Sequence, residues 1–270
     1  MLKTALIVAG VVVVIVVAVL VYKYSKYKQS QEPMLISRPK LISNVPAIEG
    51  KKLPLSSTGQ EFTYNFWIFI REWDSNDKPK CVLYRGNGGP TDFTVAAPSI
   101  WLYPKENKLM VRVSTMEPET SSNYDDATYF KYRRDEGNYS NVNPNASYPA
   151  GENIFDSSYA CDVENIPLQR WVQVSVVMFN RTLDIYINGK LARSCILPGV
   201  PAHDPNLLDS VYIGKGNTFN GYISRFKYFN RAITANDVYS LYRKGPLPAN
   251  WWWQNMKNRV KVILEIDSDA

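Results

Sequence analysis

The segment from residue 171 to residue 231 constrains the possible folds of this chain most strongly. Apolar and polar residues alternate in two runs, 172–176 and 183–187, and Asn188-Gly189 directly follows the second run. Such alternation is typical of β-strands with one buried face. An Asn-Gly pair after a strand is typical of a type I′ turn, because both residues tolerate the positive φ that this turn requires. The segment therefore predicts antiparallel hairpins.

The same succession of short strands continues over one domain, residues 53–245, which is long enough to enclose a sizeable core. It predicts an all-β, antiparallel sandwich or barrel. The exception is a helix over 234–244, where Thr234 and Asp237 form a capping box. The expected strands are 62–70, 80–84, 92–96, 99–103, 108–114, 171–179, 182–187, 190–197, 209–213 and 221–229.

The N-terminus is of a different kind. Residues 5–22 carry no charge, and as a helix they would span about 27 Å, close to the thickness of a bilayer core. A cleaved signal peptide is the alternative, but residues 22–28 contain no small-x-small cleavage site. We therefore expect residues 1–22 to be a retained transmembrane anchor whose partner is the lipid bilayer.

Charge is concentrated next to this anchor. The chain carries a net charge of +6, of which +1 lies in residues 1–22 and +5 in residues 23–52, so residues 53–270 are neutral. A neutral domain is not typical of a nucleic-acid binder, whereas a basic juxtamembrane tract suits anionic headgroups. Three lysines follow the anchor and Lys3 precedes it, which predicts that the C-terminal domain lies on the cytosolic side.

The proline-containing tract 23–52 is predicted to be an extended tether. Disorder is the default expectation for it, and order against a partner surface is the alternative.

Two further regions do not fit the strand rhythm. Residues 116–167 form a long insertion rich in Tyr, Asn, Asp and Ser, which is either a contact surface or a pair of unrecognised strands. The C-terminal extension, 246–270, contains three adjacent tryptophans that either cap the sandwich or form an exposed anchor. The candidate contact residues in these regions are Tyr124, Tyr129, Tyr132, Trp251, Trp252 and Trp253.

Several short motifs follow one another in a fixed order: Phe-Trp-Ile, Gln-Arg-Trp, Tyr-Ile-Asn-Gly-Lys, Ile-Gly and Phe-Asn-Gly, whose signature residues are Trp67, Trp171, Asn188, Gly189, Gly214 and Gly221. Their order resembles the laminin-G-like, concanavalin A-like jelly-roll domains over residues 60–245. This resemblance implies two antiparallel sheets packed face to face, which here would follow the predicted transmembrane helix.

Within that family, two stretches are similar to membrane-anchored proteins of large algal DNA viruses: CDVENIPLQRW at 161–171 and NRTLDIYINGKLARSC at 180–195. This narrower resemblance implies a virion component, such as a minor capsid protein.

The sequence offers little catalytic chemistry. A retaining glycosidase of this fold needs two carboxylates about 5 to 5.5 Å apart, and the family's ExDxxE pattern is absent. Glu265 and Asp267 form an acidic pair on a possible strand, but they lie outside the matched domain. His203, the single histidine, lies in a proline-bounded loop, and Gly214-Lys215-Gly216 is not followed by a helix. We expect no enzyme activity, no cofactor and no metal.

Three cysteines allow one disulfide. Cys161 and Cys195 flank the 171–187 hairpin and could approach each other, which would leave Cys81 free. The predicted cytosolic side favours reduced thiols, while an oxidising particle or compartment would permit the bridge. Glycosylation sequons occur at Asn138, Asn145 and Asn180, a number that chance alone would give.

These observations favour a non-enzymatic, membrane-anchored structural protein that links a viral internal membrane to the capsid shell, with capsid or other virion proteins as partners. A membrane-anchored, lectin-like adhesion module that binds a glycan is the alternative. A glycosidase is the third hypothesis.

Overall fold

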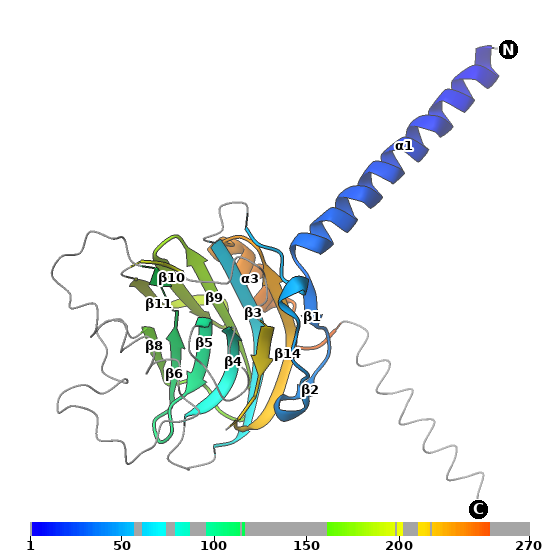
Figure 1. Ribbon diagram of the computed structural model, residues 1–270. Coiled ribbons are helices and arrows are strands. Elements are labelled where there is room, and N and C mark those ends of the chain that lie inside the picture. The colour runs from blue at the N-terminus through cyan, green and yellow to red at the C-terminus, as the bar shows by residue number, and fades with distance from the viewer. Residues whose placement is uncertain are drawn as a thin grey trace, which may run out of the picture.

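The computed structural model describes residues 2–56, 61–73, 79–86, 96–113, 115–116, 161–197, 199–201, 210–216 and 218–248. It consists of one long N-terminal helix, α1 (Leu2–Gln31), and a two-layer β-sandwich with a short helix, α3 (Ala235–Arg243), on one face (Figure 1). The predicted all-β antiparallel sandwich behind an apolar helix is confirmed.

The larger sheet follows the order β1-β14-β3-β9-β10-β11, with β2 paired to β14, and every pairing in it is antiparallel. Its centre is the long strand β3, which pairs with β14 on one side and with β9 on the other (Figure 1). The bounds are β1 (Met34–Ile36), β2 (Lys40–Leu41), β3 (Glu61–Glu72), β9 (Trp171–Phe179), β10 (Thr182–Ile187), β11 (Lys190–Ile196) and β14 (Asn220–Phe229).

The smaller sheet follows the order β13-β4-β5-β6-β8, and a separate two-stranded ladder joins β7 to β12. The bounds are β4 (Lys80–Gly86), β5 (Ala96–Leu102), β6 (Lys108–Arg112), β7 (Thr115–Met116), β8 (Cys161–Glu164), β12 (Val200–Pro201) and β13 (Ser210–Ile213). Strand β8 falls at the end of the predicted 116–167 insertion, so at that end the insertion contains a strand that the sequence pattern did not indicate.

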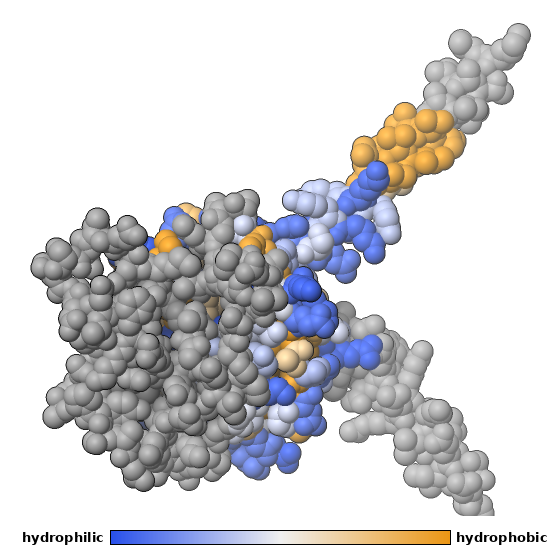
Figure 2. All heavy atoms as spheres, viewed as in Figure 1, coloured by the Kyte–Doolittle hydropathy of each residue, from blue (hydrophilic) through white to orange (hydrophobic). Residues whose placement is uncertain are grey.

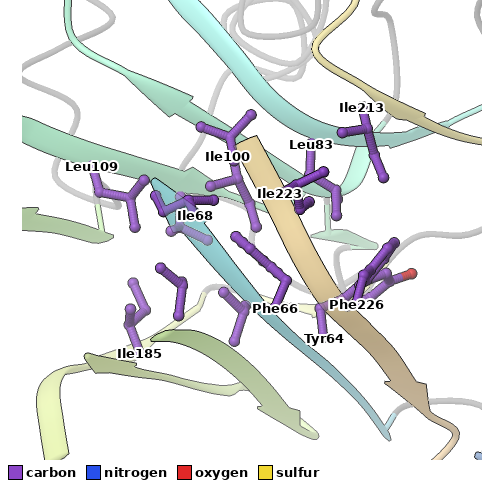
Figure 3. Packing of buried hydrophobic residues seen from close by; sticks show 14 of the residues in the cluster. Tyr64, Phe66, Ile68, Leu83, Ile100, Leu109, Ile185, Ile213, Ile223 and Phe226 are labelled. Atoms are coloured by element: carbon purple, nitrogen blue, oxygen red, sulfur yellow. The ribbon is translucent and has the colours of Figure 1, made fainter. Parts of the chain in front are cut away.

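The main core lies between the two sheets. Phe66 and Ile68 of β3 and Phe226 of β14 point toward residues such as Leu83 and Ile100 of the smaller sheet (Figure 3). These side chains are fully buried, and on β3 they alternate with residues of the opposite face, as period-2 patterning requires. On that opposite face Trp67 stacks on Tyr242, the residue of α3 that covers it, at 5.8 Å between ring centroids.

Helix α3 confirms the predicted capping box. The Thr234 side chain accepts a hydrogen bond from the backbone N–H of Asp237, and the Asp237 carboxylate accepts one from the backbone N–H of Thr234. This reciprocal pair satisfies two backbone donors that the first helical turn leaves without partners.

Helix α1 extends beyond the predicted anchor, and the predicted tether is partly helical and partly folded onto the sandwich. Helix α1 continues to Gln31, because residues 23–31 contain no helix breaker before Pro33. The polypeptide after Pro33 does not run as a free tether: β1 and β2 pair with β14, and two 3-10 turns follow, η1 (Ile42–Asn44) and η2 (Gly50–Lys52). Apolar residues at Ile42, Val45 and Leu53 are buried in the main core, which is the physical reason that this stretch is folded.

Within the described part of the chain, α1 is the one helix long and apolar enough to cross a membrane, a property shared by single-pass anchors and signal sequences. Its side chains from Gly10 to Ser30 are exposed. Figure 2 shows an apolar band on the described part of α1 far from the sandwich and polar residues where the helix approaches the sandwich.

Candidate functional site

The junction between α1 and the sandwich is centred on Glu32, whose side chain is only 7% exposed. Lys227 Nζ donates to Glu32 Oε2 at 3.0 Å, and Arg231 Nη2 donates to Glu32 Oε1 at 3.1 Å. The two cations lie near the end of β14, so one carboxylate connects the first residue after α1 to the far end of the sequence. We call these three residues the Glu32 clamp.

The clamp carboxylate is held in its charged form. Burial alone would raise the pKa of Glu32, but the hydrogen bonds and positive charges of Lys227 and then Arg231 outweigh it, so the pKa lies below its usual value. A buried charge that is paired in this way is costly to separate from its partners. The clamp therefore favours the arrangement in which α1 stays joined to β14.

Hydrogen bonds around the clamp leave no free linker between α1 and the sandwich. Asn230 Nδ2 donates to Gln31 Oε1 at 2.5 Å and to the carbonyl oxygen of Leu55 at 3.1 Å. The backbone N–H of Tyr228 donates to the carbonyl of Pro33 at 3.1 Å, and that of Asn230 donates to the carbonyl of Gln31 at 3.4 Å. The last turn of the helix is thus fastened directly to the end of β14.

The segment after β2 closes one lateral side of the sandwich. Ile48 and Val211 of β13 exchange both backbone hydrogen bonds, each 2.8 Å long, which joins this segment to the smaller sheet. On the larger sheet, the Tyr228 hydroxyl donates to the carbonyl of Pro54 at 3.0 Å. Residues 42–54 therefore lie across both sheets at this side.

The opposite lateral side is closed by a covalent bond. Cys161 of β8 and Cys195 of β11 form a disulfide with a Cα–Cα distance of 6.0 Å, and each lies on the last strand of its sheet. Cys81 is a free, buried thiol, and burial raises its pKa to about 12. A thiol with such a pKa is inert at neutral pH.

The outer face of the smaller sheet carries an aromatic cluster, made up of Cys81, Tyr84, Trp101, Tyr103 and Met110, with Tyr212 packed against it. In a sugar-binding site, aromatic rings stack on the sugar ring, and neighbouring charged groups form hydrogen bonds with its hydroxyl groups. In this structure, however, Trp101 is only 2% exposed, so its ring is not presented at the surface.

A charged group borders the aromatic cluster. Arg112 Nη1 donates to Asp162 Oδ1 at 2.5 Å, and the Tyr103 hydroxyl donates to the other oxygen of this carboxylate. Burial and the neighbouring Asp162 raise the pKa of Tyr103 above its usual range. Tyr103 is therefore held as a neutral hydrogen-bond donor.

The sequence pattern does not indicate one pair of carboxylates, because they lie on β8, a strand of only four residues. Asp162 and Glu164 share one face of β8 and, two residues apart, are separated by about 6–7 Å along the strand. Asp162 is bound by Arg112 and Tyr103, while Glu164 is exposed and pairs with Lys108 at 3.5 Å. Both carboxylates of this pair are therefore engaged in ion pairs.

Comparison with protein families gives one match: the family model of the concanavalin A-like lectin/glucanases superfamily, of the laminin G type, covers residues 79–239. The match spans more than half of the chain. The protein belongs to this superfamily. A comparison with curated proteins gives no match.

Solved structures with a similar concanavalin A-like fold share little sequence with the chain. The botulinum neurotoxin serotype C1 binding domain is 14% identical, with a TM-score of 0.40, and the match covers 69% of this chain and 37% of that one. Trypanosoma rangeli sialidase in complex with sialic acid is also 14% identical, with a TM-score of 0.42, over 68% of this chain and 23% of the other. This chain therefore matches well under half the length of either.

The signature residues of the concanavalin A-like domain lie at turns and close contacts. Gly189 has φ +78°, and Asn188 Oδ1 accepts the backbone N–H of Gln173 at 2.9 Å, so the predicted Asn-Gly turn is also bonded to β9. A Cβ on Gly221 would lie 2.1 Å from the carbonyl oxygen of Phe69, and one on Gly214 would lie 2.6 Å from that of Ile42. These two glycines permit close backbone approach.

Trp171 opens β9 and lies next to Phe69, at 5.6 Å between ring centroids. The remaining predicted site residues lie outside the described residues: Tyr124, Tyr129, Tyr132, His203, Trp251, Trp252, Trp253, Glu265 and Asp267. Among the residues that are described, no group of three His, Cys, Asp or Glu side chains is placed to hold a metal ion.

Proposed function

We propose that the protein is a non-enzymatic, single-pass membrane protein whose concanavalin A-like domain makes structural contacts at a fixed position relative to a bilayer. The Glu32 clamp is the observation that carries this proposal. A domain that is fastened to its anchor helix by ion pairs to a buried carboxylate is suited to bearing load or holding a spacing. A module that searches for ligands on a flexible linker has no need of such a junction.

The dimensions of α1 support this role. With residues 5–22 in the bilayer, residues 23–31 extend the helix by about 13 Å before it meets the clamp. Lys23, Lys26 and Lys28 lie along this exposed extension, where they would face anionic headgroups. Tyr22 and Tyr24 would lie at the interface, as aromatic belts do.

In its specific form, the proposal is a viral minor capsid component that links an internal membrane to the capsid shell. The similarity of residues 161–171 and 180–195 to algal-virus proteins motivates this form. In this form, the bias of the flanking lysines favours a sandwich on the cytosolic, capsid-facing side. The partner would then be a capsid protein.

Cross-linking mass spectrometry on intact particles or membranes tests the proposal. Wild-type protein should give reproducible cross-links from the sandwich to a partner protein, and Glu32→Gln should broaden their distance distribution while leaving membrane insertion unchanged. The exposed Glu49→Gln is the matched control. Absence of protein cross-links, or a distribution that Glu32→Gln does not alter, would reject the structural role.

A carbohydrate-binding module is the second candidate function. It is favoured by membership of the superfamily. The aromatic cluster with the adjacent Arg112 and Asp162 is buried, so it would contact a sugar only after it is uncovered. Binding of the full chain to a glycan array would support this candidate if Arg112→Met abolishes the binding. This variant removes the charge at residue 112 and leaves the aromatic rings in place. Array-wide absence of binding would remove this candidate.

A further inference from the structure

Two asparagines occupy hairpin turns in the larger sheet, and they are used differently. Asn188, between β10 and β11, accepts a backbone hydrogen bond from Gln173 through its side chain. Asn180, between β9 and β10, also has a positive φ, +52°, but its exposed side chain forms none of the hydrogen bonds found among the described residues. The positive φ of the turn thus explains why asparagine occurs at both positions. Only at Asn188 does the side-chain amide group also form a structural hydrogen bond.

Asn180 begins the tripeptide Asn180-Arg181-Thr182, which is the acceptor sequence for N-linked glycosylation. Asn180 and Arg181 are exposed at the tip of the hairpin, and Thr182 is partly exposed at the start of β10. The tripeptide is therefore accessible without local unfolding. Its amide nitrogen projects from a turn, where surface acceptor sites lie.

The side chains around this tip form an apolar surface. Thr182 pairs in register with Phe179 on one side and with Ile196 on the other. Phe179 is 52% exposed and Ile196 is 76% exposed. Both point away from the core, because their neighbours Met178 and Cys195 face the opposite sheet. These two exposed side chains therefore lie beside Thr182 of the acceptor tripeptide.

The disulfide lies one register position away. Leu183, the residue after Thr182, pairs with Cys195, which is bonded to Cys161. Disulfides form and persist in oxidising compartments such as the secretory lumen, where N-linked glycans are also added. The accessible acceptor tripeptide and the disulfide are thus both suited to the same compartment.

We infer that Asn180 carries an N-linked glycan and that the sandwich therefore lies on the lumenal, extracytosolic side of the membrane. The donor is an oligosaccharide attached to a polyisoprenyl pyrophosphate, presented by a lumenal oligosaccharyltransferase. The amide nitrogen of Asn180 forms a bond to C1 of the first sugar, while the bond from C1 to the pyrophosphate oxygen breaks. The lipid pyrophosphate leaves with the electron pair, and the amide gives up one proton to a base of the transferase.

This inference goes beyond the proposed function, because a clamped contact domain can serve on either side of a membrane. It does distinguish a sandwich in the cytosol from a sandwich outside the cytosol. A glycan on Asn180 contradicts the cytosolic orientation predicted from the flanking lysines and, with it, the direct link to a cytosolic capsid shell. It favours contacts made outside the cytosol.

The test is expression of the full chain in eukaryotic cells, followed by removal of N-glycans with a glycosidase in heavy-oxygen water and peptide mass spectrometry. The expected result is conversion of Asn180 to a heavy-oxygen-labelled Asp. Asn180→Gln and Thr182→Ala should each remove one glycan from the intact protein, as a step in gel mobility. Thr182→Ser, which keeps the hydroxyl, and Arg181→Lys, which keeps the acceptor, should retain it.

Two outcomes would overturn the inference. If Asn138 or Asn145 is labelled while Asn180 is not, the domain is lumenal and this site is unused. If none is labelled and protease added to intact microsomes digests the sandwich, the domain is cytosolic. Both outcomes are independent of the cross-linking result, so failure of this inference and failure of the proposed function can be told apart.

Discussion

The two lateral sides of the sandwich are closed by different means. At the β1 and β13 side, residues 42–54 lie across both sheets and are held by backbone hydrogen bonds and buried apolar side chains. At the β11 and β8 side, the Cys161–Cys195 disulfide joins the two edge strands. The first closure is continuous with the anchor helix, so anchoring and folding depend on the same residues. The second closure depends on the oxidation state and not on the anchor.

Removing the disulfide should give the largest effect. The bond spans 34 residues, and a closed loop of that length restricts the unfolded chain by about 4 kcal/mol. Cys161→Ser/Cys195→Ser should lower the free energy of unfolding by roughly this amount, measured by chemical denaturation of the full chain in detergent. Cys81→Ala is the matched control, since it removes a buried sulfur atom and leaves the disulfide intact. Equal stability of the double variant and the wild type would show that β8 and β11 are held together by packing alone.

Truncating a buried side chain in residues 42–54, the closure on the anchor side, should lower the free energy of unfolding somewhat less. Ile42 is fully buried, and a buried isoleucine changed to alanine costs about 3 kcal/mol, through lost burial and the cavity left behind. Ile42→Ala should therefore destabilise the sandwich although the residue lies in the tract predicted to be a free tether. Met34→Ala, at an exposed position of β1, is the control and should change stability little. An unchanged unfolding midpoint for Ile42→Ala would mean that residues 42–54 dock without supporting the core.

The disulfide-side hairpins could be predicted from sequence, and the tether-side closure could not. Strands β9, β10 and β11 follow one another, so alternation and the Asn188-Gly189 turn determine their pairing locally. The strands β1 and β2 are two or three residues long, too short to show a period, and they pair with β14 almost two hundred residues away. Short strands with distant partners leave no local pattern.

The candidate site illustrates the same limit. In the sequence, Glu32 is one acidic residue in a basic tract, a pattern typical of solvated charge, and its partner Lys227 lies 195 residues further along the chain. Net charge carries no information about which opposite charges meet in the folded state. The pair of Arg112 and Asp162 was hidden similarly, because β8 was not recognised as a strand. Family signature residues such as Gly221, in contrast, could be identified from the sequence because each belongs to a short motif.

Neutralising the clamp should have a smaller effect than either truncation. Lys227 and Arg231 stay partly exposed, so Glu32→Gln should cost about 1–2 kcal/mol locally, below the cost of breaking a fully buried pair. Hydrogen exchange of the backbone amides of Tyr228 and Asn230, which bond to residues 31 and 33, should become faster. Glu49→Gln, whose carboxylate is exposed and 4.0 Å from Lys52, should leave these rates unchanged.

The same contribution should depend on pH in a defined direction. Because the pKa of Glu32 is lowered in the folded state, its stabilising effect is fully present above the ordinary glutamate value of 4.5 and is lost as the pH falls through the lowered value. Wild type and Glu32→Gln should therefore differ in amide exchange at pH 6 and converge in strongly acidic buffer. A difference that persists unchanged to the lowest pH would assign the effect to packing and not to charge.

The smallest expected effect is the rate of Cys81 alkylation, which should be close to zero in the wild type. Measuring this rate allows the two closures to be compared in one experiment. With its pKa at about 12, about one thiol in ten thousand is ionised at pH 8, so iodoacetamide should react only after the structure opens. Cys81 lies on β4, outside both closures, and is the single thiol outside the disulfide. If the closures are independent, Ile42→Ala and Cys161→Ser/Cys195→Ser should each accelerate alkylation in proportion to their loss of stability, and the combined variant should show the product of the two factors. A combined rate well below that product would mean that opening one side already opens the other, so that the tether and the disulfide close the sandwich as a single cooperative unit.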